Sequence, residues 1–145
     1  WKIGEVFMMK IVVAIDSLKG SLTSIQAGEA IEKGIKKVDL EAEVVIKPLA
    51  DGGEGCLDAQ TAMGKAPIGV AKLAKKYGKL VLGFSGAVTK GATACNEAGI
   101  DAYFPIVRSA VSLEDAMKKK NAQENLIDTV EQVFPCDKSI KIKIS

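Results

Sequence analysis

The chain has 145 residues, of which 48% are hydrophobic and 5% aromatic, so it is long enough to bury one core of aliphatic side chains. Its 20 Lys and Arg residues against 18 Asp and Glu leave a net charge of +2. Because the basic residues are spread along the chain, they imply neither a nucleic-acid partner nor a membrane. Histidine is absent, which excludes Ser-His-Asp and Cys-His nucleophile systems and most catalytic zinc sites.

The cysteines, Cys56, Cys95 and Cys136, are odd in number and form no CxxC pair, so they indicate neither a disulfide framework nor a zinc site. We interpret them as structural thiols in a reducing cytoplasm. No apolar run approaches the roughly 18 residues needed to cross a bilayer, and residues 1–7 are too mixed for a secretory signal. The sequence therefore predicts a soluble, cytoplasmic protein.

The first predicted unit is a strand followed by a helix and a second strand. Lys10 to Asp16 is a short β-branched run, typical of a strand buried on both faces in a parallel sheet. Ser21 or Thr23 can cap the helix that follows. A second strand is expected over 43–49, with a proline near its end. The helix has apolar positions at helical spacing: Ala27, Ile31, Ile35 and Val38.

The same alternation continues in the second half of the chain. We expect a helix over Pro67 to Tyr77 that stops at Gly78, because proline fits the first turn of a helix and glycine its C-terminal stop. A third strand is expected over Leu80 to Phe84, then a short helix around 89–98 and a fourth strand over 101–106.

A capping box of Ser112 and Asp115 is expected to begin one long last helix. Its predicted apolar face consists of Leu113, Met117, Leu126, Val130 and Val133. The whole order predicts a doubly wound α/β domain with a mostly parallel sheet flanked by helices. In such folds ligands bind beyond the carboxyl ends of the strands.

Two segments at these expected strand ends contain candidate functional residues. In the segment 16–21, Asp16 could accept a proton or bind magnesium, and Lys19 could neutralise a phosphate or a carboxylate. In the segment 50–65, Asp51 and Glu54 are candidate metal or substrate ligands, the glycines are candidate phosphate contacts, and Lys65 is a charge near a helix N-terminus. The alternatives are an ordinary capped turn and a flexible loop.

Neither a P-loop nor a GxGxxG fingerprint is present. Ser85-Gly86 and the segment 89–91 occupy another strand-to-helix connection, where ordinary turn chemistry is the better explanation.

Four stretches resemble the bacterial glycerate kinase family. KIVVAIDSLKGSLTSIQAGEAIEKGI (10–35) and VIKPLADGGEG (45–55) are similar to its N-terminal blocks, with Ile15 where proline is common and Leu18 where phenylalanine is common. GEGCLDAQTAMGKAPIGVAKLAKKYGK (53–79) and the segment from SGAVTKGA to DTVEQVF (85–134) are similar to its C-terminal blocks. The family's large middle region is missing, and the junction falls on the shared tripeptide at 53–55, as an internal deletion or an assembly error would leave it.

The resemblance implies a Rossmann-like domain built from both chain ends, with the family's inserted second domain absent. We expect residues 1–8 to be an extension, 9–136 a single Rossmann-like domain (9–55 and 53–136 being its two blocks), and 137–145 a tail. A strand expected before the second GEG would be lost, with the strand over 44–49 in its place.

The resemblance also implies ATP-dependent phosphorylation of D-glycerate to phosphoglycerate with Mg²⁺, a reaction in which positioning and charge neutralisation supply most of the rate. By resemblance, Asp16, Lys19 and Asp51 are catalytic, and Asp51 and Glu54 hold the metal. The remaining cleft residues are Ser17, Gly52, Gly53, Gly55, Asp58, Gln60, Thr61 and Lys65.

Loss of one cleft wall predicts impaired activity, because a two-walled cleft excludes water and orients the substrates. Two alternatives stay open: a non-catalytic domain that binds phosphate or an organic acid, and a nonfunctional fragment whose exposed apolar surface drives self-association.

Overall fold

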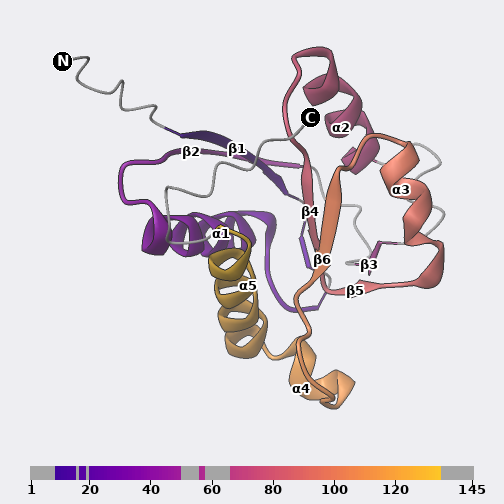
Figure 1. Cartoon of the computed structure of the whole chain (residues 1–145). Coiled ribbons are helices and arrows are strands. Elements are labelled where there is room, and N and C mark those ends of the chain that lie inside the picture. Colours follow the sequence, from indigo (N-terminus) through magenta and orange to yellow (C-terminus); the bar gives the residue numbers. More distant parts are fainter. Residues whose placement is uncertain (1–8, 16, 19, 50–55, 58–65, 135–145) are drawn as a thin grey trace.

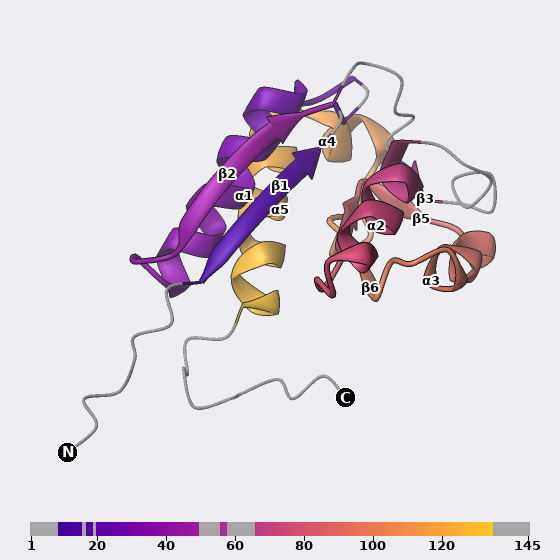
Figure 2. The same ribbon diagram turned by 90° about the horizontal axis from the view of Figure 1, so that it is seen from above.

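The computed structural model describes residues 9–15, 17–18, 20–49, 56–57 and 66–134 (Figure 1). The predicted extension and tail lie outside these residues. The first unit is strand β1 (Lys10–Ile15), helix α1 (Ser24–Val38) and strand β2 (Glu43–Pro48). β1 and β2 pair in parallel, with Val13 opposite Ile46, and α1 lies along one face of the pair (Figure 2). The connection through α1 is long enough to join two parallel strands, and the three elements form the βαβ unit that the sequence predicts.

Helix α1 begins where the sequence predicts a cap. The Thr23 hydroxyl accepts the Gln26 backbone N–H at 3.2 Å, and the Gln26 side-chain oxygen accepts the Thr23 N–H at 3.2 Å, which completes a capping box. Its predicted apolar face is buried at Ala27, Ile31 and Ile35. Thr23, rather than Ser21, is therefore the cap.

The second half of the chain adds shorter elements. They are β3 (Cys56–Leu57), α2 (Ala66–Lys76), β4 (Leu82–Ser85), β5 (Ala87–Val88), the 3₁₀ helix η2 (Lys90–Thr93), α3 (Ala94–Glu97), β6 (Ala102–Pro105), α4 (Leu113–Met117) and α5 (Lys119–Val133). β3 pairs with β5 and β4 with β6, both in parallel. The predicted α/β class with parallel strands is confirmed. Within the described residues the strands form three two-stranded ladders, β1–β2, β3–β5 and β4–β6.

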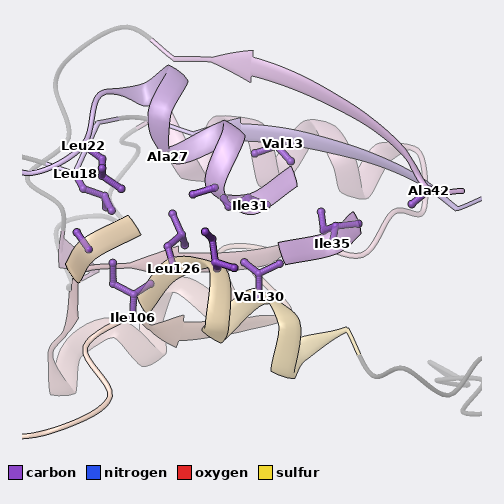
Figure 3. Close-up of a cluster of buried hydrophobic side chains, with 13 residues drawn as sticks. Val13, Leu18, Leu22, Ala27, Ile31, Ile35, Ala42, Ile106, Leu126 and Val130 are labelled. Carbon is purple, nitrogen blue, oxygen red and sulfur yellow. The ribbon is translucent and has the colours of Figure 1, made fainter. Parts of the chain in front are cut away.

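Two groups of buried apolar side chains form the interior. The first cluster joins β1, the turn after it, α1, Ile106 and α5 (Figure 3). The second cluster lies under α2 and α3 and consists of Ile68, Ala71, Ala92, Cys95 and Ile100. Phe84 of β4 packs against the first cluster, and its ring stacks on Phe104 of β6 with centroids 5.6 Å apart.

Helices α1 and α5 pack closely because α1 has a glycine at their crossing. A Cβ atom built on Gly34 would lie 2.9 Å from the Ile127 carbonyl oxygen and 2.9 Å from Val130 Cβ. Beside this contact Lys37 Nζ lies 2.9 Å from Glu131 Oε2. Helix α5 is thus packed closely against α1.

The prediction of one long last helix is wrong. Lys118 has φ −59° and ψ 127°, which leaves the helical region and separates α4 from α5. Leu113 is 75% exposed and Met117 38% exposed, so these two residues are outside the core, whereas Leu126 and Val130 are buried. The apolar spacing thus continues across Lys118, whereas the helix is interrupted there.

Two strand predictions also need correction. β1 is buried on its inner face only: Val12 on the other face is 61% exposed, and beside it Lys10 pairs with Glu43 at 2.8 Å. The third predicted strand, β4, begins at Leu82, two residues later than expected, and Leu80, which is 45% exposed, lies outside the ladder.

Candidate functional site

Strands β1 and β2 end at the same edge of their ladder. The ladder closes with Ile15 opposite Pro48, and the Leu49 N–H donates to the Ile15 carbonyl oxygen at 2.9 Å. The two candidate segments of the sequence, 16–21 and 50–65, therefore leave neighbouring strands at this carboxyl edge. In parallel α/β folds this is the edge where ligands bind.

A tight turn follows β1 at this edge. The Leu18 N–H donates to the Leu22 carbonyl at 2.9 Å, and the Leu22 N–H donates to the Leu18 carbonyl at 3.1 Å. Gly20 between them has φ +81°, a conformation that favours glycine. Because Leu18 and Leu22 are both buried in the first cluster, their side chains anchor the turn to the core. Ser17, at its start, is half-buried.

Helix α4 contacts this turn through its last residue, Met117. The space that a Cβ atom on Gly20 would occupy is taken by the Met117 methyl group, whose Cε would lie closer than any allowed contact. The Asn121 amide donates to the Asp115 carbonyl oxygen at 2.8 Å, which ties α4 to the start of α5. The Ser112 hydroxyl accepts the Asp115 N–H at 3.1 Å and caps α4.

The Asp115 carboxylate is used within α4. It accepts hydrogen bonds from Lys118 Nζ at 2.6 Å and from the Ser112 hydroxyl at 2.8 Å. The Lys118 hydrogen bond, with help from Ser112, holds the pKa of Asp115 below its usual range. Asp115 is therefore a structural carboxylate rather than a candidate base.

Ser17 is the sequence-predicted site residue that the structure describes. The others lie outside the described residues: Asp16, Lys19, Asp51, Gly52, Gly53, Glu54, Gly55, Asp58, Gln60, Thr61 and Lys65. Their described neighbours place the starts of both segments, at Ile15 and at Leu49, side by side. Within the described ranges, no cluster of three or more His, Cys, Asp or Glu side chains is arranged to hold a metal ion.

Lys75 and Asp101 form a second charged group, which lies at the amino ends of β4 and β6. The Asp101 carboxylate accepts a hydrogen bond from Lys75 Nζ at 2.5 Å and another from the Val81 N–H at 2.7 Å. Burial would raise the pKa of Asp101, but the Lys75 hydrogen bond and the Val81 N–H outweigh it, so the pKa is lowered. This group joins the end of α2 to the starts of β4 and β6, away from the carboxyl edge. Sequence reasoning missed it, because residues 75 and 101 belong to different elements and no local pattern links them.

Turn chemistry accounts for Ser85, as the sequence predicts. Its side chain is buried and its hydroxyl donates to the Ala87 carbonyl at 2.7 Å. Thr89 and Lys90 are exposed at the start of η2. Cys95 is fully buried in the second cluster, which confirms its structural role. In the part of the chain that the structure describes, no helix is long and apolar enough to span a membrane.

Comparison with known proteins identifies a family for this chain. The model of the glycerate kinase family matches residues 11–59 and again 53–136. The two matches overlap at residues 53–59, in the segment that follows β2. No solved structure was found to match the chain.

Curated relatives agree with the family match. The chain is 44% identical to the glycerate kinase of Bacillus subtilis over 67% of its own length and 26% of that protein. It is 37% identical to the glycerate kinase of Haemophilus influenzae over 77% of the chain and 29% of the relative. It is 38% identical to the glycerate 2-kinase of Escherichia coli over 63% of the chain and 25% of the relative. The chain thus spans between a quarter and three tenths of the length of these relatives.

Proposed function

This chain belongs to the glycerate kinase family, and we propose that it phosphorylates D-glycerate with ATP, more slowly than the longer relatives it resembles. The observation that carries the proposal is the pair of family matches, which together cover residues 11–136 and meet in the segment that follows β2. The packing of the two matched stretches supports the proposal. Helix α1 from the first match and α5 from the second both contribute buried side chains to the first cluster, so the two stretches pack against one another.

The proposed catalytic groups are Asp16, Lys19 and Asp51. Asp16 precedes Ser17 after β1 and Lys19 follows it by two residues, and Asp51 comes two residues after Leu49 at the end of β2, so both segments start from adjoining strand ends. Lys19 would neutralise charge on a transferring phosphoryl group, and a carboxylate, Asp16 or Asp51, would orient or deprotonate the glycerate hydroxyl. Such a reaction needs no histidine, in accord with the composition.

The proposed metal ligands are Asp51 and Glu54. Their carboxylate oxygens are the hard donors that Mg²⁺ prefers, and the metal would neutralise phosphate charge when bound with ATP. The backbone N–H groups of the glycines beside them suit an anion. The further residues proposed to line the nucleotide and substrate cleft are Ser17, Gly52, Gly53, Gly55, Asp58, Gln60, Thr61 and Lys65.

The proposed reduction in rate follows from what the chain lacks relative to its relatives. Because two separate family matches overlap at residues 53–59, we propose that an internal deletion joined two blocks there, leaving one Rossmann-like domain over 9–136. A cleft with one wall admits water and orients its substrates less well. We also propose that the protein acts in the cytoplasm, in line with its cysteine pattern.

A coupled assay for ADP release with D-glycerate and MgATP tests the proposal. The double variant Lys19→Ala/Asp51→Ala should lose turnover, whereas Lys72→Ala/Asp128→Asn, which removes the same types of charge from exposed helix positions, should keep it. Equal turnover in both variants, or none in the natural chain, rejects catalysis. The ³¹P spectrum of the product identifies which glycerate hydroxyl is phosphorylated.

The second candidate is a non-catalytic domain that binds phosphate or an organic acid. The observation that favours it is the short length of the match, which covers between a quarter and three tenths of the three glycerate kinases named above. Calorimetry with glycerate and MgATP supports binding without catalysis when heat is released and the ADP assay stays silent. If the protein sediments as concentration-dependent oligomers and shows neither binding nor turnover, the result supports a nonfunctional fragment that self-associates.

A further inference from the structure

Helix α4 is held in place although it buries none of its residues. Its start is capped by Ser112, and its Asp115 carbonyl accepts the Asn121 amide at 2.8 Å. A five-residue helix is too short to be stable alone, and without buried side chains it adds almost nothing to either cluster. Its place therefore needs another explanation than core formation.

The contact that α4 makes with the candidate site is through Met117. The Met117 methyl group fills the space beside Gly20 that a side chain at that position would need. On the other side the turn is anchored by Leu18 and Leu22 in the first cluster. The turn after β1 is thus held between the core and one flexible apolar side chain.

We propose that Met117 is a positioning residue for Ser17 and the turn that follows it, acting through Gly20. This inference rests on the proposed kinase function, because Ser17, at the start of the turn, is one of the residues proposed to line the cleft. The geometry explains why position 20 is a glycine: it supplies the positive φ of the turn and leaves room for the methionine at the same time. A methionine suits the contact because its side chain adapts to an irregular surface.

Three variants separate positioning from folding. Met117→Ala removes the contact, Met117→Leu keeps most of its volume, and Leu113→Ala removes an apolar side chain one helical turn earlier that is 75% exposed. We expect Met117→Ala to lower kcat/KM for glycerate by about tenfold, chiefly through kcat, because misplacing a catalytic group by a fraction of an ångström has effects of that order. Met117→Leu should recover most of the loss, and Leu113→Ala should match the natural chain.

Urea unfolding of the same proteins checks that the effect is local. The unfolding midpoints of all three variants should agree with that of the natural chain, since neither residue belongs to the core. A fall in kcat/KM that is equal in Met117→Ala and Leu113→Ala, or that Met117→Leu fails to recover, overturns the proposal. So does a fall that simply follows a lowered midpoint.

Amide exchange keeps the inference testable if the natural chain has no turnover, an outcome that rejects the proposed function alone. The N–H groups of Leu18, Ser21 and Leu22 are hydrogen-bonded within the turn. We expect Met117→Ala to speed exchange at these amides severalfold, with Met117→Leu and Leu113→Ala unchanged. Unchanged exchange in Met117→Ala would show that the side chain does not hold the turn, and would overturn the inference whatever the kinase assay gives.

Discussion

The two apolar clusters are built in different ways, although each has several fully buried side chains. The first cluster takes Ala27, Ile31 and Ile35 from the first family-matched stretch and Leu126 and Val130 from the second. The second cluster, around Ile68 and Cys95, lies wholly within the second stretch. Cohesion between the two stretches therefore depends mainly on the first cluster.

This difference has a consequence for the candidate site. The turn after β1 is anchored by Leu18 and Leu22 in the first cluster, and the α4 contact reaches it from the second stretch. Damage to the first cluster should thus reach the site, whereas damage to the second should stay near α2 and α3. The following predictions test this separation, from the largest effect to the smallest.

Truncation of one buried residue in each cluster gives the largest expected effect. Leu126→Ala and Ile68→Ala each remove a side chain that is 1% exposed, so each should cost about 2–5 kcal/mol of unfolding free energy. We expect Leu126→Ala to speed amide exchange in α1 as well as α5, and Ile68→Ala to speed exchange in α2 and α3 while α1 keeps its protection.

Exchange measured residue by residue, with urea unfolding for the free energies, makes the comparison. Leu113→Ala serves as the exposed control and should change neither quantity appreciably. Equal loss of protection in α1 for both buried variants would show that the clusters unfold as one unit.

Two helix glycines sharpen the comparison further. Gly34→Ala places a Cβ atom 2.9 Å from the Ile127 carbonyl oxygen and from Val130, so we expect a loss of about 1–3 kcal/mol from overpacking. Gly69→Ala in α2 meets nothing within 4 Å and should gain about 0.5–1 kcal/mol from helix propensity. Thermal or urea unfolding reports both, and stabilisation by Gly34→Ala would contradict the close approach of α1 and α5.

Acid should weaken the surroundings of the second cluster through Asp101. Because Lys75 and the Val81 N–H hold the folded-state pKa of Asp101 below its ordinary value of 3.8, this carboxylate stabilises the fold at neutral pH. That contribution is lost as pH falls below about 4 and through the folded-state pKa. The pair is partly exposed, so the effect should stay under about 1 kcal/mol.

Urea midpoints at pH 7 and pH 3 measure this contribution. Asp101→Asn should be less stable than the natural chain at pH 7 and should lose less stability on acidification, whereas Asp128→Asn, on the exposed side of α5, should follow the natural chain. An unchanged pH dependence in Asp101→Asn would assign the acid sensitivity to other groups.

Local signals in the sequence predicted the first unit well. The cap at Thr23 and the spacing of Ala27, Ile31 and Ile35 are features of one helix, and the structure confirms them. The βαβ order likewise follows from runs of residues that need no distant partner to be recognised. The carboxyl edge of β1 and β2 was therefore predictable as the place of the candidate segments.

Features that depend on distant contacts were not predictable. Leu113 and Met117 fit the spacing of Leu126, but the backbone at Lys118 turns away, so the predicted long helix is two helices. β5 is two residues long and is defined by pairing with β3, which no pattern in either segment reveals. At the site, sequence identified Ser17 as a candidate but could not show that Met117 lies against Gly20, since nearly a hundred residues separate them.

The packing of α5 on α1 sets an order of events during synthesis. The ribosome releases β1, α1 and β2 well before residues 119–133. Until α5 is made, the side chains that it covers stay exposed, among them Ile31, Ile35 and the inner face of the two strands. Domains acquire their stable packing only when the segments that complete them have emerged, and until then such apolar faces invite association with other chains. Until α5 has emerged, these apolar faces therefore stay exposed to other chains.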